Sequence, residues 1–155
     1  MRHTYLFKEG SWEAKGTYYD QLNREYPVNG ESTITHEEKL WINQSSIRLL
    51  GIDSSELVNR YQVVPFSGDV TEWSSFDPSM GLLYGRYIVV RDTIISNFRS
   101  EDGVYSGTEC MIKLYEHKYQ VRGFIFKGNS KVSSWSLTLT AKFDRGNWND
   151  ESERP

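Results

Sequence analysis

Apolar and polar residues alternate along most of this chain, in short segments separated by glycine, proline, asparagine or aspartate. In the segment at residues 12–19, the even positions carry Trp12, Ala14, Gly16 and Tyr18. A period of two is that of a β-strand with one face turned toward a core. The same parity returns at Ser32, Ile34 and His36, so we expect the even positions of both segments to point inward.

Nine or ten such segments, spaced about ten residues apart, fill the chain as far as Phe143, which is the rhythm of an all-β domain. They lie at residues 12–19, 31–37, 40–50, 57–66, 70–76, 82–90, 93–99, 104–116, 119–127 and 131–143. Pro27 and Asn29-Gly30 are predicted to separate the first two strands, and residues 54–60 leave a helical turn open as an alternative. We expect one domain at residues 1–155: a single antiparallel up-and-down barrel of about eight to ten strands at residues 8–145, then a polar tail at 146–155.

A turn at residues 117–118 and a loop at 128–130 set the expected register of the last three strands. The loop places Trp135 over Gly123, which has no side chain of its own. One apolar inward face then collects Cys110, Ile112, Leu114, Val121, Ile125, Trp135, Leu137 and Leu139. A wrong register would mix polar and apolar residues on this face.

The net charge, cysteine count and hydropathy of the chain argue against several classes of function. The chain has 155 residues and a net charge of -3, and its basic residues are scattered, so a nucleic-acid binder is not expected. A single cysteine, Cys110, rules out an internal disulfide framework and suits a reducing compartment. Neither a signal peptide nor an apolar stretch long enough to span a membrane is visible. We therefore expect a cytoplasmic protein.

The polar residues give no catalytic or metal-binding signature. Three scattered histidines and one cysteine lack the spacing of a metal site, so no metal or cofactor is predicted. His117 is expected in a surface turn and His3 in the N-terminal tail. His36 is left with three readings: a buried histidine with a hydrogen-bond partner, an exposed strand end, or a ligand contact. The sequence leans against an enzyme.

The start of the first strand, Gly10-Ser11-Trp12, resembles the Gly-x-Trp motif of the lipocalin-like (calycin) barrels. The resemblance implies that Trp12 plugs one barrel end beneath a cation from the last strand. Arg145 is preferred over Lys142 because it shares the parity of the inward set. The absence of paired cysteines and of a strong final helix places the chain nearest to a bacterial branch of these barrels whose function is unassigned.

Barrels of this size commonly enclose a ligand cavity, so we expect a small apolar or amphipathic ligand. The candidate cavity residues are aromatic or could anchor a polar group, and they are His36, Trp41, Trp73, Tyr84, Arg86 and Trp135. Arg86 would favour an acidic ligand, although it has the alternatives of facing solvent or pairing with Glu109. Two other functions stay open: an enzyme of the isomerase or lyase type, and a protein-interaction barrel, with a homodimer formed through Met111, Phe124 and Phe126.

Overall fold

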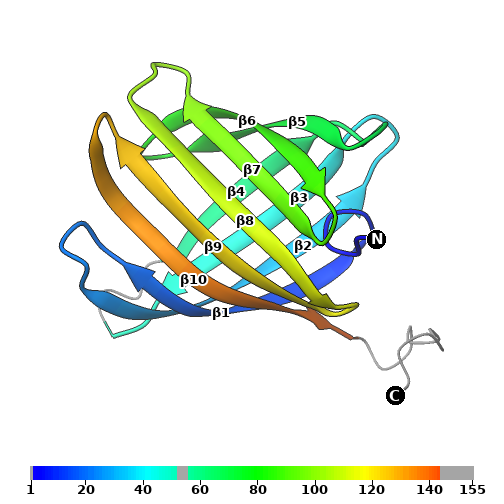
Figure 1. Cartoon of the computed structure of the whole chain (residues 1–155), viewed down its shortest axis with the longest axis horizontal. Helices are drawn as coiled ribbons and strands as arrows, with labels where there is room; N and C mark the ends of the chain where they lie inside the picture. The colour runs from blue at the N-terminus through cyan, green and yellow to red at the C-terminus, as the bar shows by residue number, and fades with distance from the viewer. Residues whose placement is uncertain (1, 52–55, 144–155) are drawn as a thin grey trace.

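The computed structural model describes residues 2–51 and 56–143, which form one closed barrel of ten antiparallel strands (Figure 1). The strands are β1 (Gly10–Tyr19), β2 (Glu25–His36), β3 (Trp41–Leu49), β4 (Glu56–Val63), β5 (Val70–Asp77), β6 (Gly81–Val90), β7 (Thr93–Ser100), β8 (Tyr105–Tyr115), β9 (Lys118–Lys127) and β10 (Ser130–Lys142). Each strand pairs with its neighbours in the sequence, and β1 pairs with β10 to close the sheet. The all-β barrel predicted from the sequence is confirmed. Within the described residues, no helix is long and apolar enough to cross a membrane.

Strand β2 begins earlier than the sequence indicates. Pro27 and Asn29-Gly30, predicted to interrupt the chain, lie inside a strand that pairs with both β1 and β3. A Cβ at Gly30 would collide with the carbonyl oxygen of Ser46, so this glycine permits a close approach of two backbones rather than a turn. Residues 56–60 of the suggested helical turn are strand, and residues 52–55 lie outside the described residues.

The predicted register holds between β9 and β10 but is wrong between β8 and β9. Gly123 lies opposite Trp135 as expected, whereas Val121 lies opposite Met111 and not Leu114. The turn falls one residue earlier than predicted, and a β-bulge between Lys113 and Tyr115 adds an extra residue to β8. A bulge of one residue reverses which side chains face inward beyond it.

The outcome for the predicted inward face is therefore mixed. The members that point inward are Val121, Ile125, Trp135, Leu137 and Leu139. The members that point outward are Cys110, Ile112 and Leu114. In their place, Glu109, Met111 and Lys113 face the interior, and Met111 is only 2% exposed.

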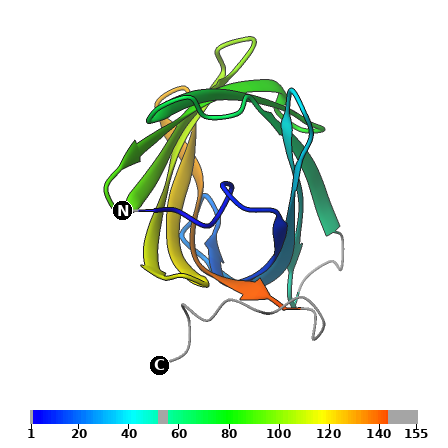
Figure 2. The same cartoon turned by 90° about the vertical axis from the view of Figure 1, so that its right-hand side faces the viewer.

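One half of the barrel, here called the packed half, is filled with side chains. Residues 2–9 cross the barrel opening at this end, as the dark-blue segment in Figure 2 shows, and bury Tyr5 and Leu6. The interior beneath them is apolar and aromatic, and its buried members include Trp12, Ile34, Val63, Ile94, Met111, Tyr119, Val121 and Leu139. Tyr119 is completely buried and lies edge-on to the Trp12 ring, with their centroids 5.6 Å apart. The packed half supplies the continuous core of the fold.

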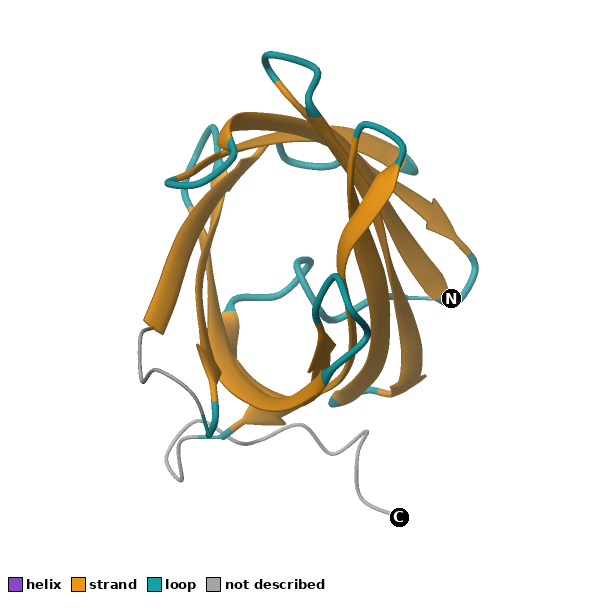
Figure 3. Cartoon of the chain, turned by 90° about the vertical axis from the view of Figure 1, so that its left-hand side faces the viewer, coloured by secondary structure: helices purple, strands orange, loops and turns teal. Residues whose placement is uncertain are grey.

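The other half, here called the open half, faces the viewer in Figure 3. Its rim is made by the β1–β2, β5–β6, β7–β8 and β9–β10 connections. Inward-facing residues of this half are only half-buried, and they include Tyr18, Leu49, Tyr61, Phe98, Tyr105, Glu109, Ile125 and Trp135. Since these side chains point away from the outer surface, the accessible part of each lies toward the barrel interior.

Candidate functional site

The open half is walled by aromatic side chains. The inward-facing rings are Tyr18, Tyr61, Trp73, Phe98, Tyr105 and Trp135. Tyr61 meets Trp73 edge-on with ring centroids 5.3 Å apart, and Trp73 lies 5.8 Å from Phe98. Five of these rings are half-buried and form an apolar surface toward the interior of the open half, whereas Trp73 is 5% exposed and belongs to the buried core. An aromatic surface of this kind is the usual lining of a small-molecule site.

Three glycines explain why these rings do not fill the barrel. Gly85 lies under Trp73, Gly107 under Phe98 and Gly123 under Trp135. A Cβ on any of the three would collide with the ring above it, so each ring lies against the wall in the space that its glycine leaves free. The glycines thus keep large aromatic surfaces inside the barrel without closing its interior.

Glu109 is a carboxylate among these rings. It lies opposite Gly123, which in turn lies opposite Trp135, so the three residues form a row across β8, β9 and β10. The indole crosses the glycine, and its Nε1–H donates a hydrogen bond of 2.7 Å to Glu109 Oε2. Burial raises the pKa of Glu109 above its ordinary value, and the Trp135 hydrogen bond opposes that rise only in part.

The Glu109 carboxylate also raises the pKa of nearby tyrosine side chains. Burial, and then the nearby Glu109 carboxylate, raise the pKa of Tyr61 above its ordinary value. Burial also raises the pKa of Tyr87, with smaller contributions from Tyr5, Tyr61 and Glu109. Among the described residues, no cation contributes to the pKa of Glu109. The site therefore carries an acid with no basic counterpart beside it.

A layer of buried residues closes the bottom of the open half. Val63, Tyr87, Met111 and Leu137 are each at most 8% exposed. Below this layer, the hydroxyl groups of Tyr5 and Ser32 lie 3.0 Å apart, and Asn43 bonds to both. Burial raises the pKa of Tyr5 to about 12, although its bond with Ser32 lowers it. These polar groups satisfy one another, so they belong to the packed half rather than to the ligand site.

The wall between β4 and β5 is the least continuous part of the sheet. These strands share three residue pairs, from Tyr61 with Ser75 to Val63 with Trp73. No pair follows toward the open rim among the described residues, whereas the β5–β6 register continues to Asp77 and Gly81. The two strands therefore separate beside Tyr61, which widens the access to the aromatic walls.

The structure divides the six predicted cavity residues among three places. Trp73 and Trp135 lie in the open half, on either side of the interior. His36 and Trp41 stack on each other in the packed half, with ring centroids 4.1 Å apart. The Nε2–H of His36 donates to the carbonyl oxygen of Leu6 over 2.7 Å, so His36 holds the N-terminal segment in place.

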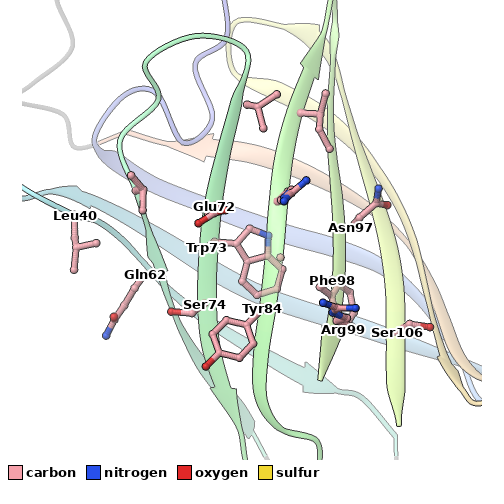
Figure 4. A pocket seen from close by; sticks show the side chains of 15 residues that line it. Leu40, Gln62, Glu72, Trp73, Ser74, Tyr84, Asn97, Phe98, Arg99 and Ser106 are labelled. Atoms are coloured by element: carbon pink, nitrogen blue, oxygen red, sulfur yellow. The ribbon is translucent and has the colours of Figure 1, made fainter. Parts of the chain in front are cut away.

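Tyr84 and Arg86 lie on the outside of the barrel. The β6 strand carries apolar residues at both odd and even positions, so the sequence does not show which face points inward. In the structure, Leu83 and Tyr87 are the buried positions of this strand. Tyr84 and Arg86 instead line a groove of about 960 Å³ on the outer face of β4–β8, shown in Figure 4. The same groove includes Glu72 and Arg99, and Arg86 cannot pair with the inward-facing Glu109.

Trp12 is buried at one barrel end, and its neighbours are Tyr5 and Tyr119, both edge-on. Lys142, the second choice for the cation over Trp12, points outward and binds Glu31. Arg145, the preferred cation, lies outside the described residues, so its place beside Trp12 stays a prediction.

His3, expected in the N-terminal tail, lies in the segment before β1 and is 5% exposed. Its ring bonds to the Tyr119 hydroxyl and to the Arg91 carbonyl oxygen, each over 2.8 Å. The sequence did not predict this burial, because the tertiary contacts of a short irregular segment leave no periodic pattern.

Glu109 is the candidate site residue that the sequence reasoning missed. The predicted register placed it outside, and the β8 bulge moved it inside. The signal that could have found it is the pair Gly107 and Gly123, since a glycine within a strand often marks an inward position beneath a large ring.

No protein-family model matches the chain, and no curated protein matches it. Two solved structures are similar over most of their length. An S-type phycobiliprotein lyase from Guillardia theta has a TM-score of 0.66 at 10% identity, covering 90% of this chain and 91% of the lyase. Rv2717c from M. tuberculosis has a TM-score of 0.65 at 14% identity, covering 87% of this chain and 92% of that protein.

The fold is a lipocalin-like barrel. At these identities the likeness extends to the fold alone, so the structural part of the resemblance seen in Gly10-Ser11-Trp12 is supported. The bacterial branch suggested above stays a prediction. Function has to be argued from the residues of the open half.

Proposed function

We propose that the open half of the barrel binds a small amphipathic molecule. The observation that carries the proposal is the wall of rings seated on glycines, with the Glu109 carboxylate among them. Apolar ligand surface would replace water against the half-buried rings of Phe98 and Trp135, and each Å² removed from water contributes about 25 cal/mol. A polar group on the ligand would meet Glu109.

We propose an acid as the polar anchor in place of the predicted Arg86 or His36. Arg86 is on the outer face and His36 is in the packed half, whereas Glu109 faces the interior. A ligand that donates a hydrogen bond to a carboxylate therefore fits the site better than the acidic ligand suggested by Arg86.

The test is calorimetric titration with naphthalenemethanol, an uncharged aromatic alcohol. The wild-type chain should show saturable binding. In Gly123→Val, the added side chain pushes the Trp135 ring into the interior and should weaken binding at least about tenfold. Gly68→Ala is the matched control, because a Cβ at Gly68 meets nothing within 4 Å and should leave the affinity unchanged.

A second variant with a larger side chain in the interior tests whether loss of binding could come from misfolding of Gly123→Val alone. Ile125→Trp adds bulk at a half-buried, inward position of β9 and should also abolish binding, while circular dichroism confirms that the barrel has formed. Undiminished binding to folded Gly123→Val and Ile125→Trp would place the ligand elsewhere and contradict the proposal.

Self-association is the second candidate, on the outer face of β8 and β9. Leu114, Tyr115 and Phe124 are 44%, 71% and 40% exposed there, and Phe124 lies edge-on to Phe126 at 5.6 Å. Met111 was predicted to belong to this outer patch, but it is buried in the interior and is not part of it. Light scattering of the wild type and Phe124→Ser tests this face, since a dimer built on it would dissociate in the variant.

Catalysis finds less support. Among the described residues, the one hydrogen bond to the Glu109 carboxylate comes from an indole, which does not exchange protons readily. An isomerase or lyase mechanism would need a second proton-transfer group within reach of the ligand.

A further inference from the structure

We propose that the ligand of the open half is a primary or secondary amine, bound as its ammonium ion by Glu109. This inference rests on the proposed ligand site and names the chemical class that the site selects. It begins from the two oxygens of the carboxylate. Oε2 accepts the Trp135 Nε1–H, and no described residue donates to Oε1. Oε1 of Glu109 is thus left for a donor that none of the described residues supplies.

Two cations of residues 2–51 and 56–143 face the barrel interior, and both are engaged away from Glu109. Lys113 lies at the packed end, where its Nζ donates to the Arg2 carbonyl oxygen and to Glu116. Lys127 lies at the open rim, with its Nζ 5.8 Å from the centroid of the Tyr105 ring. A carboxylate withdrawn from water without a counter-charge is unfavourable, so a cationic ligand would supply the compensating charge.

A second inward-facing carboxylate among the described residues, Asp77, lies at the rim at the end of β5. Its Oδ1 accepts hydrogen bonds from the backbone N–H groups of Ser79 and Met80, so it holds the turn into β6. Glu109 differs from it because it stands farther inside, and the hydrogen bond to its Oε2 comes from an aromatic side chain and not from the backbone of a turn.

The rings around Glu109 suit an ammonium group as well as an apolar body. Trp135 lies next to the carboxylate, Phe98 lies opposite Gly107 on the neighbouring strand β7, and Tyr61 lies farther round the barrel on β4. The face of an aromatic ring attracts a cation, by about 0.5–1 kcal/mol at exposed sites and more where water is excluded. An ammonium ion would therefore meet a carboxylate on one side and ring faces on the others.

Acids and uncharged molecules fit less well. A carboxylic acid would bring a second negative charge to Glu109, and like charges repel in a site of low dielectric constant. An alcohol can donate to Oε1, but a hydrogen bond between two charged groups is roughly twice as strong as one between neutral groups. Arg86 and Arg99 give the outer groove the opposite preference, so the charge of the ligand distinguishes the two places.

The experiment compares three ligands with one hydrocarbon body: naphthalenemethylamine, naphthalenemethanol and naphthoic acid, titrated calorimetrically near neutral pH, where the amine is protonated. The wild type should bind the amine at least about tenfold more tightly than the alcohol, and the acid most weakly. Glu109→Gln should bring the amine to within about twofold of the alcohol and leave the alcohol nearly unchanged. Glu72→Gln, an equal change of charge in the outer groove, should keep the preference for the amine.

The outcomes separate this inference from the proposed function. Equal affinity of the wild type for the amine and the alcohol would contradict the proposed preference for an amine and would still be consistent with a ligand site in the open half. Absence of binding by all three would overturn the site itself. If Glu109→Gln does not fold, Trp135→Phe serves instead: it removes the indole donor and keeps the carboxylate, so the preference for the amine should persist, and its disappearance there would contradict the role of Glu109.

Discussion

The two halves of the barrel are built from the same ten strands and use aromatic residues in opposite ways. In the packed half, Trp12 meets Tyr5 and Tyr119 edge-on, all three rings are buried, and the N-terminal segment covers them. In the open half, Trp73 and Trp135 lie against glycines and no segment among the described residues crosses the opening. Trp73 lies over Gly85 and is 5% exposed, whereas Trp135 lies over Gly123 and is half-buried, so Trp135 is the glycine-seated tryptophan that borders accessible space.

The largest expected difference is between two tryptophans. Trp12→Ala should cost about 3–5 kcal/mol of unfolding free energy, because it leaves a cavity in a closed core. Trp135→Ala should cost only about 1–2 kcal/mol, because its ring borders space that is already open. Urea unfolding of both variants measures the contrast, and equal losses would remove the distinction between the halves.

The second prediction concerns His3, which helps to hold the cover of the packed half. His3→Ala leaves the Arg91 carbonyl oxygen without its ring donor and should cost about 1–3 kcal/mol. The measurement is again urea unfolding near neutral pH. A loss below about 0.5 kcal/mol, the size of an ordinary surface effect, would mean that the N-terminal segment is not part of the core.

His3 also gives the packed half a pH dependence. Burial lowers its pKa below the ordinary value of 6.5, although the Arg91 hydrogen bond opposes this and Lys113 adds to it. Because the folded state disfavours the protonated ring, the neutral His3 ring contributes its full stability above pH 6.5. This contribution is lost as the pH falls from 6.5 through the lowered pKa of the folded state. The wild type should lose more stability than His3→Phe between about pH 7.5 and about pH 5.

Glu109 should give the open half a smaller dependence of opposite sign. Its raised pKa means that the neutral form is favoured in the fold, so stability is lost as the pH rises from the ordinary 4.5 through the raised value. Glu109→Gln does not titrate, and its melting temperature should exceed that of the wild type by more at about pH 8 than at about pH 4. A gap that narrows as the pH rises would contradict the burial of this carboxylate.

The smallest effects are expected outside the barrel. Arg86→Ala changes an exposed residue of the outer groove and should alter the unfolding free energy by less than about 0.5 kcal/mol. It should also leave the affinity for naphthalenemethylamine unchanged. Weaker amine binding in this variant would favour the outer groove over the open half.

The sequence predicted the parts of the structure that repeat with a strict period of two. The inward parity of Trp12 and His36, and the pairing of Gly123 with Trp135, follow from alternation and from one turn. Glu109 could not be placed, because a single extra residue in β8 reverses the facing of its strand. Arg86 could not be placed either, since β6 is apolar on both faces.

The ligand position can be read from the indole N–H signals of the wild-type chain by two-dimensional NMR during titration with naphthalenemethylamine. The Trp135 Nε1–H, which bonds to Glu109, should shift most, and the Trp73 Nε1–H, which bonds to Ser96, should shift less. The signals of Trp12 and Trp41, both in the packed half, should stay in place. Saturable shifts of Trp12 or Trp41 with an unmoved Trp135 would contradict a ligand site in the open half.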